Sequence, residues 1–271
     1  MWVMLASALA VLSPARRLAI MLLLCATLAG FFTDTLRWPA LLPLAVSALL
    51  VWLRVENPAR RGLQVMTETA LLLTAGGLFL HLWPGFQPLL QVDNMQAGPR
   101  SLPFSFAYHF DKALIPFVLL ACLPTLFRTR PFPPRHISAW LLLLAAIPLL
   151  LYVAVCTGGL APERHWPAWL GRFMLANLFF VALAEEALFR GYLQQRLRQR
   201  LGNLPALLLA SLLFGVAHVA GGALLVLFAT LAGVIYGLAW HWSGRLWVAA
   251  GVHFLFNLTH LLWFTYPALQ H

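Results

Sequence analysis

The chain has 271 residues, of which 62% are hydrophobic and only 10% are charged, and its mean hydropathy is +0.83. Soluble domains are about 45–50% apolar and 25% charged, so a soluble globular enzyme is excluded. A disordered chain and a disulfide-rich scaffold are excluded as well. The net charge of +10 comes from 17 Arg and one Lys against eight acids. These basic residues lie almost entirely between apolar runs, where they mark membrane topology, so no nucleic-acid partner is expected.

Apolar runs of helical length follow one another along the chain. Residues 2–12 are too short to cross a bilayer, and we expect them to lie on the membrane or to be half inserted. Nine longer runs are near the ~17–25 residues that a spanning helix needs. They are 18–33, 38–53, 68–83, 113–127, 137–157, 168–189, 204–222, 223–242 and 246–264. The run around Gly221 and Gly222 could be one kinked pass, so the expected fold is all-α, a polytopic membrane bundle of eight or nine transmembrane helices.

The loops between these runs predict the orientation of the chain. Sorting the basic residues into alternate loops gives a 13 to 5 split, which favours a cytoplasmic N-terminus. The larger set is Arg16, Arg17, Arg54, Arg60, Arg61, Arg128, Arg130, Arg135, Arg190, Arg196, Arg198, Arg200 and Arg245. The excess of Arg over Lys indicates a GC-rich bacterial genome and hence the bacterial inner membrane. The longest connector, 84–112, contains four prolines and several aromatic residues, and is expected to form an external cap or a re-entrant loop.

Two adjacent carboxylates, Glu185 and Glu186, lie inside the run 168–189. An ionisable side chain in lipid costs a few kcal/mol or more, which makes each of them a functional candidate. Glu186 and Arg190 are four residues apart and share a helix face, so they are expected to form an ion pair. Glu185 points about 100° away and is free to face a cavity, where it could act as a general base. The alternative is a purely structural ion pair with one carboxylate protonated.

Polar side chains on two later helices complete a candidate site. Phe214 and His218 share one face, as do His253 and Asn257, because each pair has i, i+4 spacing. If the chain turns near Gly202, ideal antiparallel helices place Glu185 and His218 level, roughly 25 Å from the turn. They place His253 about 10 Å deeper, a gap that tilt or a non-helical stretch would have to close. One intramembrane His alone usually only packs helices, but three polar faces together predict a site.

The remaining polar residues have less specific interpretations. His260 lies seven residues after His253 and could line the outer end of the site. Asp111 and Lys112 are expected to neutralise one another at the interface, and Glu68 is expected to occupy a helix N-terminus, where the helix dipole favours an anion. The other histidines are expected near interfaces or in loops that face water: His81, His109, His136, His165 and His271.

The three motifs resemble those of a known family. Glu185-Glu186-x-x-x-Arg190, Phe214-x-x-x-His218 and His253-x-x-x-Asn257 follow in this order on successive helices, and Arg190-Gly191-Tyr192-Leu193 completes the first motif. This pattern resembles the CPBP family of intramembrane proteases, which includes CAAX prenyl proteases and bacteriocin-processing proteins with the ABI domain. The resemblance covers about residues 165–265. We therefore interpret 166–271 as a CPBP-like catalytic transmembrane core and 1–165 as N-terminal transmembrane helices without a recognised motif.

The resemblance implies hydrolysis of a peptide bond inside the bilayer. Glu185 would activate a water, while His218, His253 and Asn257 would hold that water and the developing oxyanion. Glu186, Arg190 and Phe214 would have supporting roles. The expected partners are the lipid bilayer and a membrane-anchored protein or peptide substrate, cut close to the cytoplasmic face.

Alternatives to this enzyme remain open. A His/His/Glu set also suits catalytic zinc, but no HExxH motif is present, so a metal-independent enzyme without cofactor is preferred over a zinc-dependent one. A non-catalytic membrane module, such as a bacteriocin immunity or scaffold protein, would use the same helices to bind a partner. A transporter would require polar residues along the full depth of the bilayer, whereas the polar residues here cluster.

Overall fold

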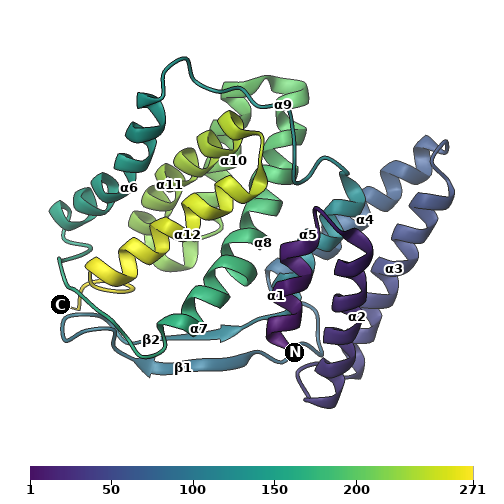
Figure 1. Cartoon of the computed structure of the whole chain (residues 1–271), viewed down its shortest axis with the longest axis horizontal. Helices are drawn as coiled ribbons and strands as arrows, with labels where there is room; N and C mark the ends of the chain where they lie inside the picture. The colour runs from purple at the N-terminus through teal and green to yellow at the C-terminus, as the bar shows by residue number, and fades with distance from the viewer. Residues whose placement is uncertain (271) are drawn as a thin grey trace.

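The computed structural model describes residues 1–270 and is mostly helical (Figure 1). The first half contains α1 (Trp2–Val11), α2 (Arg16–Phe32), η1 (Trp38–Ala40), α3 (Leu41–Glu56), α4 (Arg61–Phe79), β1 (Leu89–Met95), β2 (Phe104–Tyr108), α5 (Phe110–Cys122) and α6 (Ser138–Cys156). The second half contains α7 (Leu170–Leu175), η2 (Ala176–Ala182), α8 (Leu183–Glu186), η3 (Ala187–Gln194), α9 (Gln195–Leu201), α10 (Asn203–Val216), η4 (Val219–Gly221), α11 (Gly222–Ser243) and α12 (Leu246–Trp263).

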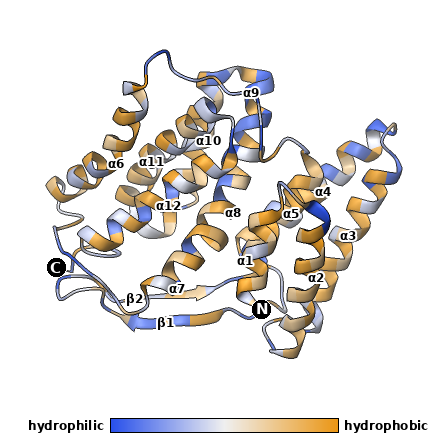
Figure 2. Ribbon diagram, viewed as in Figure 1, coloured by the Kyte–Doolittle hydropathy of each residue, from blue (hydrophilic) through white to orange (hydrophobic). Residues whose placement is uncertain are grey.

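Each of the nine apolar runs contains a helix, as the sequence predicts. Within residues 1–270, four helices are long and apolar enough to cross a membrane: Trp38–Glu56, Ser138–Cys156, Val219–Ser243 and Leu246–Trp263. Figure 2 shows hydrophobic residues along most of the helices and hydrophilic residues gathered on α9 and β1. The chain is therefore an integral membrane protein, and the number of eight or nine spans remains a prediction.

The connector 84–112 forms an antiparallel β-hairpin, which the expectation of an all-α fold missed. Val92 of β1 is paired with Phe106 of β2. Phe104 and Phe106 lie on one face of β2, because side chains alternate along a strand, and their rings stack 6.1 Å apart. Both rings pack against Trp169, at 5.3 and 5.7 Å between centroids. The hairpin therefore covers the end of the bundle where α7 begins (Figure 1).

Residues 170–201 form one continuous helical segment with two π-helical parts, η2 and η3. Single π turns inside helices are frequent at functional sites, and here α8, which carries both candidate glutamates, separates the two. The segment ends at Leu201, and Gly202 makes the predicted turn with a φ of +84°, a conformation that favours glycine. The later run breaks between α10 and α11, where Gly222 has a φ of +88°. The two helices are thus separate elements.

The hydrophobic core joins both halves of the chain. One cluster of buried residues includes Leu5 and Leu9 of α1, and also Ala184 and Ala250. One face of α1 therefore packs against the bundle while Val3 is exposed, and the prediction of a membrane-lying or half-inserted segment stays a prediction. The division into 1–165 and 166–271 remains a prediction, but the core crosses that boundary.

Glu68 forms ion pairs with residues from both halves of the chain. Its carboxylate pairs with Arg54 at 2.9 Å and with Arg196, and it accepts a hydrogen bond from the Tyr192 hydroxyl at 2.8 Å. The expectation of a helix N-terminus for Glu68 is wrong, because α4 begins seven residues earlier, at Arg61. Arg54 comes from α3 and Arg196 from α9, so one carboxylate joins helices from both halves.

Candidate active site

Glu186 is the centre of a fully buried polar network. Its Oε1 lies 3.1 Å from Arg190 Nη1, which is the ion pair predicted from the i, i+4 spacing, and both side chains are 0% exposed. Arg190 also donates from Nη2 to the carbonyl of Gly233 at 2.9 Å. A Cβ atom at position 233 would lie 3.0 Å from Arg190 Nη2, so glycine allows this close approach of α11. The Oε2 atom of Glu186 is buried without a hydrogen-bond partner among residues 1–270.

His253 of α12 is held by this network. Its Nδ1 lies 2.9 Å from Glu186 Oε1, and because a carboxylate accepts, Nδ1 carries the proton and Nε2 is left for another partner. The Tyr236 ring stacks on the imidazole at 4.4 Å with 12° between the planes. Ideal helices place His253 about 10 Å deeper than His218. In the structure both imidazoles contact the ring of Phe214. The segment that carries Glu186 is not an ideal α-helix, because the π-helical parts η2 and η3 on either side of α8 have i→i+5 hydrogen bonds.

His218 follows the end of α10 and is also fixed in one tautomer. Its Nδ1 donates to the carbonyl of Phe214 at 2.8 Å, which leaves Nε2 as an acceptor. The Phe214 ring lies 4.8 Å from the His218 ring and 5.7 Å from the His253 ring. The Arg190 guanidinium lies over Phe214 at 4.5 Å. Phe214 is therefore the packing group that joins both imidazoles to the buried ion pair.

Glu185 faces a different neighbour, Lys112 of α5. Its Oε1 lies 3.5 Å from Lys112 Nζ, and the Glu185 side chain is 6% exposed. The predicted neutralisation of Asp111 by Lys112 is wrong, because consecutive helical residues point about 100° apart. Asp111 instead contacts His81 at 2.6 Å. Lys112 is therefore a residue beside the candidate site that the sequence interpretation missed.

Asn257 pairs with a second amide that was also missed. Its Nδ2 donates to Asn177 Oδ1 at 3.3 Å, and Asn177 is buried in η2. The sequence could have indicated Asn177, because it is a polar amide in the same apolar run as Glu185, eight residues before that glutamate. In lipid such a side chain needs a partner, and Asn257 supplies it.

A cavity of about 600 Å³ lies beside these residues. Its polar lining is His218, His253, Asn257, Asn177, Tyr236 and His260, and the rest is mostly apolar. The prediction that His260 could line the outer end of the site agrees with this position. Phe106 and Ala107 of the hairpin and Tyr266 also reach the cavity. Glu185 and Glu186 are not among the lining residues, but Glu186 contacts one of them, His253.

The site thus combines four kinds of group. Two imidazoles have their Nε2 atoms available, two amides are paired, one carboxylate is fixed, and one carboxylate pairs with an ammonium group. Within residues 1–270, no three of the residues Glu185, Glu186, His218 and His253 offer one donor atom each within 4.8 Å of one another. Proton transfer and oxyanion binding are chemistry that this set can perform as it stands.

The other histidines differ in their surroundings. His136 is exposed and His81 is partly exposed, as expected. His165 is buried, which contradicts the prediction that it faces water. Its Nε2 contacts Glu163 at 2.9 Å and its Nδ1 contacts the carbonyl of Leu261 at 2.6 Å. His271 lies outside the described residues.

Comparison with known proteins gives one match. Residues 167–259 match a family model described as type II CAAX prenyl endopeptidase Rce1-like. No curated protein and no solved structure is significantly similar to the chain. The matched segment begins before η2 and includes Glu185, His218, His253 and Asn257. The resemblance found in the three motifs is thereby confirmed.

Proposed function

We propose that this chain is an intramembrane endopeptidase, because residues 167–259 match the model of the Rce1-like family of type II CAAX prenyl endopeptidases. The family implies a protease that acts on a membrane-associated protein or peptide. The observation that carries the proposal is that polar side chains from three parts of the matched segment line one cavity. His218 follows α10, His253 and Asn257 come from α12, and Asn177 comes from η2. Glu186 of α8 contacts His253 from outside this lining.

In this proposal Glu185 is the general base that activates the attacking water. Lys112 favours the ionised carboxylate, which is the form that accepts a proton. His218 and His253 accept hydrogen bonds from that water through their Nε2 atoms. The developing oxyanion accepts hydrogen bonds from the amide of Asn257 and from an imidazole once its Nε2 is protonated. Glu186 and Arg190 orient His253 in the way that a buried carboxylate orients a catalytic imidazole.

The cavity favours a substrate with apolar residues near the scissile bond. Its lining includes Leu150, Leu160, Leu224 and Phe228, which can pack against the apolar tail of a membrane-anchored chain. A cavity of about 600 Å³ accommodates a few residues, not a folded domain. The substrate is therefore proposed to be an extended, lipid-embedded segment, cut near the cytoplasmic face. A bacterial inner membrane and a cytoplasmic N-terminus belong to the same proposal.

We propose that catalysis needs no metal ion. Within residues 1–270, no three of Glu185, Glu186, His218 and His253 offer donor atoms within 4.8 Å of one another, which supports this proposal, because zinc ligands converge on one point at about 2.0–2.3 Å. The tautomers of the two histidines are explained by hydrogen bonds to Phe214 and Glu186.

The test is cleavage of a library of membrane-anchored peptides, prenylated and unprenylated, by detergent-purified protein. We expect wild type to cleave in the presence of a chelator, and Glu185→Gln to lose about 10²–10⁴-fold in rate, the usual contribution of a general base. Glu56→Gln, at an exposed position, is the matched control and keeps full activity. Cleavage by Glu185→Gln at the wild-type rate contradicts the assignment. Absence of cleavage by wild type across the library favours the non-catalytic membrane module.

A further inference from the structure

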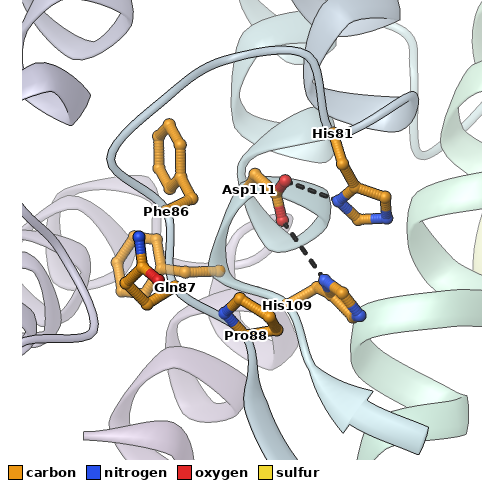
Figure 3. A pocket seen from close by; sticks show the side chains of 7 residues that line it. His81, Phe86, Gln87, Pro88, His109 and Asp111 are labelled. Atoms are coloured by element: carbon orange, nitrogen blue, oxygen red, sulfur yellow. Dashed lines mark hydrogen bonds and ion pairs between the residues drawn. The ribbon is translucent and has the colours of Figure 1, made fainter.

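A second polar cluster lies outside the segment that matches the family. His81 follows the end of α4, His109 precedes α5, and Asp111 is in the first turn of α5. Figure 3 shows the two imidazoles turned toward the Asp111 carboxylate. His81 Nδ1 lies 2.6 Å from Asp111 Oδ2, and His109 Nδ1 lies 3.9 Å from Asp111 Oδ1. Within residues 1–270, this is the one group of three potential metal ligands whose donor atoms all lie within 4.8 Å of one another.

The cluster has the features of a prepared binding site. The Asp111 side chain is 4% exposed and accepts a hydrogen bond from the backbone N–H of Lys112 at 2.9 Å, which fixes the carboxylate. The two imidazole rings lie 4.3 Å apart at an angle of 39°. His81 has a φ of +55°, a left-handed conformation that costs a residue other than glycine some backbone energy. This conformation is maintained where the side chain meets Asp111.

The space beside the cluster suits an ion with its water. A cavity of about 210 Å³ is lined by His81, His109, Asp111 and Gln87, among others. A water molecule takes about 30 Å³ of liquid volume, so the cavity holds an ion and several waters. The His side chains are about one third exposed, which gives an ion a path from solvent.

The chemistry of the three side chains selects the kind of ion. Two imidazoles and one carboxylate suit divalent transition metals, and zinc commonly binds three such protein ligands with water in the fourth position. Tetrahedral zinc separates its ligand atoms by about 3.3 Å, given bond lengths of about 2.0–2.1 Å. The 2.6 Å contact must therefore widen and the 3.9 Å contact must shorten. His81 and His109 lie in connecting segments outside the helices, which allows these small movements.

We propose that His81, His109 and Asp111 bind a divalent transition metal ion, with zinc as the best match, at a site separate from the proteolytic cavity. The ion replaces the direct contact between His81 Nδ1 and Asp111 Oδ2. It joins the segment after α4 to the start of α5, and so has a structural role beside the hairpin. This inference does not depend on the proposed peptidase activity.

The experiment measures zinc bound to tag-free protein that has been stripped with chelator, equilibrated with zinc chloride and passed over a desalting column. We expect about one zinc ion per wild-type chain. The double variant His81→Ala, His109→Ala is expected to retain none. His136→Ala removes an exposed histidine elsewhere and is the matched control, with zinc content equal to wild type.

Two further measurements keep the result interpretable. Circular dichroism of each variant without metal reports whether it is folded, and zinc is expected to raise the melting temperature of wild type but not of the double variant. Cobalt in place of zinc is expected to give the visible absorption of a tetrahedral site in wild type and in His253→Asn. A folded double variant that binds zinc like wild type overturns the proposal, as does a wild type that binds none. Loss of zinc in His253→Asn alone also overturns it, by placing the ion in the proteolytic cavity.

Discussion

Glu185 and Glu186 are neighbours in sequence, but their carboxylates lie in two different regions of the molecule. Glu186 is enclosed by Arg190 and His253 and is 0% exposed. Glu185 is held by one ion pair, to Lys112, whose side chain is 19% exposed. Arg190 and His253, the partners of Glu186, lie within residues 167–259. Lys112, the partner of Glu185, comes from the N-terminal half. Environments this different assign different tasks to two otherwise identical side chains.

This difference indicates how the two regions divide the work. The Glu186 region is a fixed support that sets the orientation of His253. The Glu185 carboxylate forms an ion pair with Lys112, and in the proposed mechanism it accepts the proton of the attacking water. This ion pair also gives the N-terminal half a part in the site, through Lys112 and α5.

The largest loss of stability is expected when the ion pair between Glu186 and Arg190 is broken. Arg190→Met leaves the Glu186 charge buried without its partner, and removing one member of a buried ion pair costs about 3–5 kcal/mol. We expect the free energy of unfolding in detergent to fall by that amount, with loss of cleavage as a consequence. Arg200→Met, at an exposed position of α9, is the control and should unfold like wild type. Equal stability of the two variants would show that the network is not a support.

A smaller effect, on activity and not on stability, is expected when Lys112, the ion-pair partner of Glu185, is replaced. Lys112→Met removes the positive charge 3.5 Å from the carboxylate. We expect kcat/KM for peptide cleavage to fall about tenfold, or ~1.4 kcal/mol, with little change in the melting temperature. Lys112→Arg keeps the charge and should restore most of the activity. If Arg fails to restore activity although the protein is folded, the role of Lys112 is not electrostatic.

The smallest change in stability is expected far from Glu185 and Glu186, at Glu163, which contacts Ser101 and His165. Burial raises the pKa of Glu163, but hydrogen bonds from His165, Ser101 and the backbone of Arg100 outweigh it and hold the pKa below the ordinary 4.5. The stabilisation is therefore present above pH 4.5 and is lost as the pH falls through the lowered pKa. The melting temperature of wild type should decrease in this acid range, and that of Glu163→Gln should decrease less. An identical acid dependence in both proteins would contradict the role of these hydrogen bonds.

Much of the fold was predictable because the bilayer imposes a simple pattern. A spanning helix needs a long apolar run, and each such run in this chain contains a helix. The hairpin was missed because its prolines and aromatic residues are equally typical of a re-entrant loop. The partial burial of α1 was missed because its apolar residues suit lipid and protein surroundings equally well, and only packing distinguishes them.

The site was predictable where its residues are close in sequence. The spacing of Glu186 and Arg190 and the turn at Gly202 follow from helix geometry, and the structure confirms both. Lys112 was not predictable as a partner of Glu185, since 73 residues separate them and no local pattern relates them. The contact of His253 with Glu186 was not predictable either, since 67 residues separate them and ideal helices place His253 about 10 Å deeper than His218.

The most direct test compares Glu185→Gln with Glu186→Gln, using peptide cleavage and thermal unfolding on the same preparations. We expect Glu185→Gln to lose cleavage with an unchanged melting temperature, because Gln is isosteric and Lys112 is partly solvated. Glu186→Gln should lower the melting temperature, because it leaves Arg190 unpaired, and should retain measurable cleavage when folded. The reverse pattern, with an active Glu185→Gln and a stable but inactive Glu186→Gln, would make Glu186 the general base and contradict the division of roles between the two carboxylates.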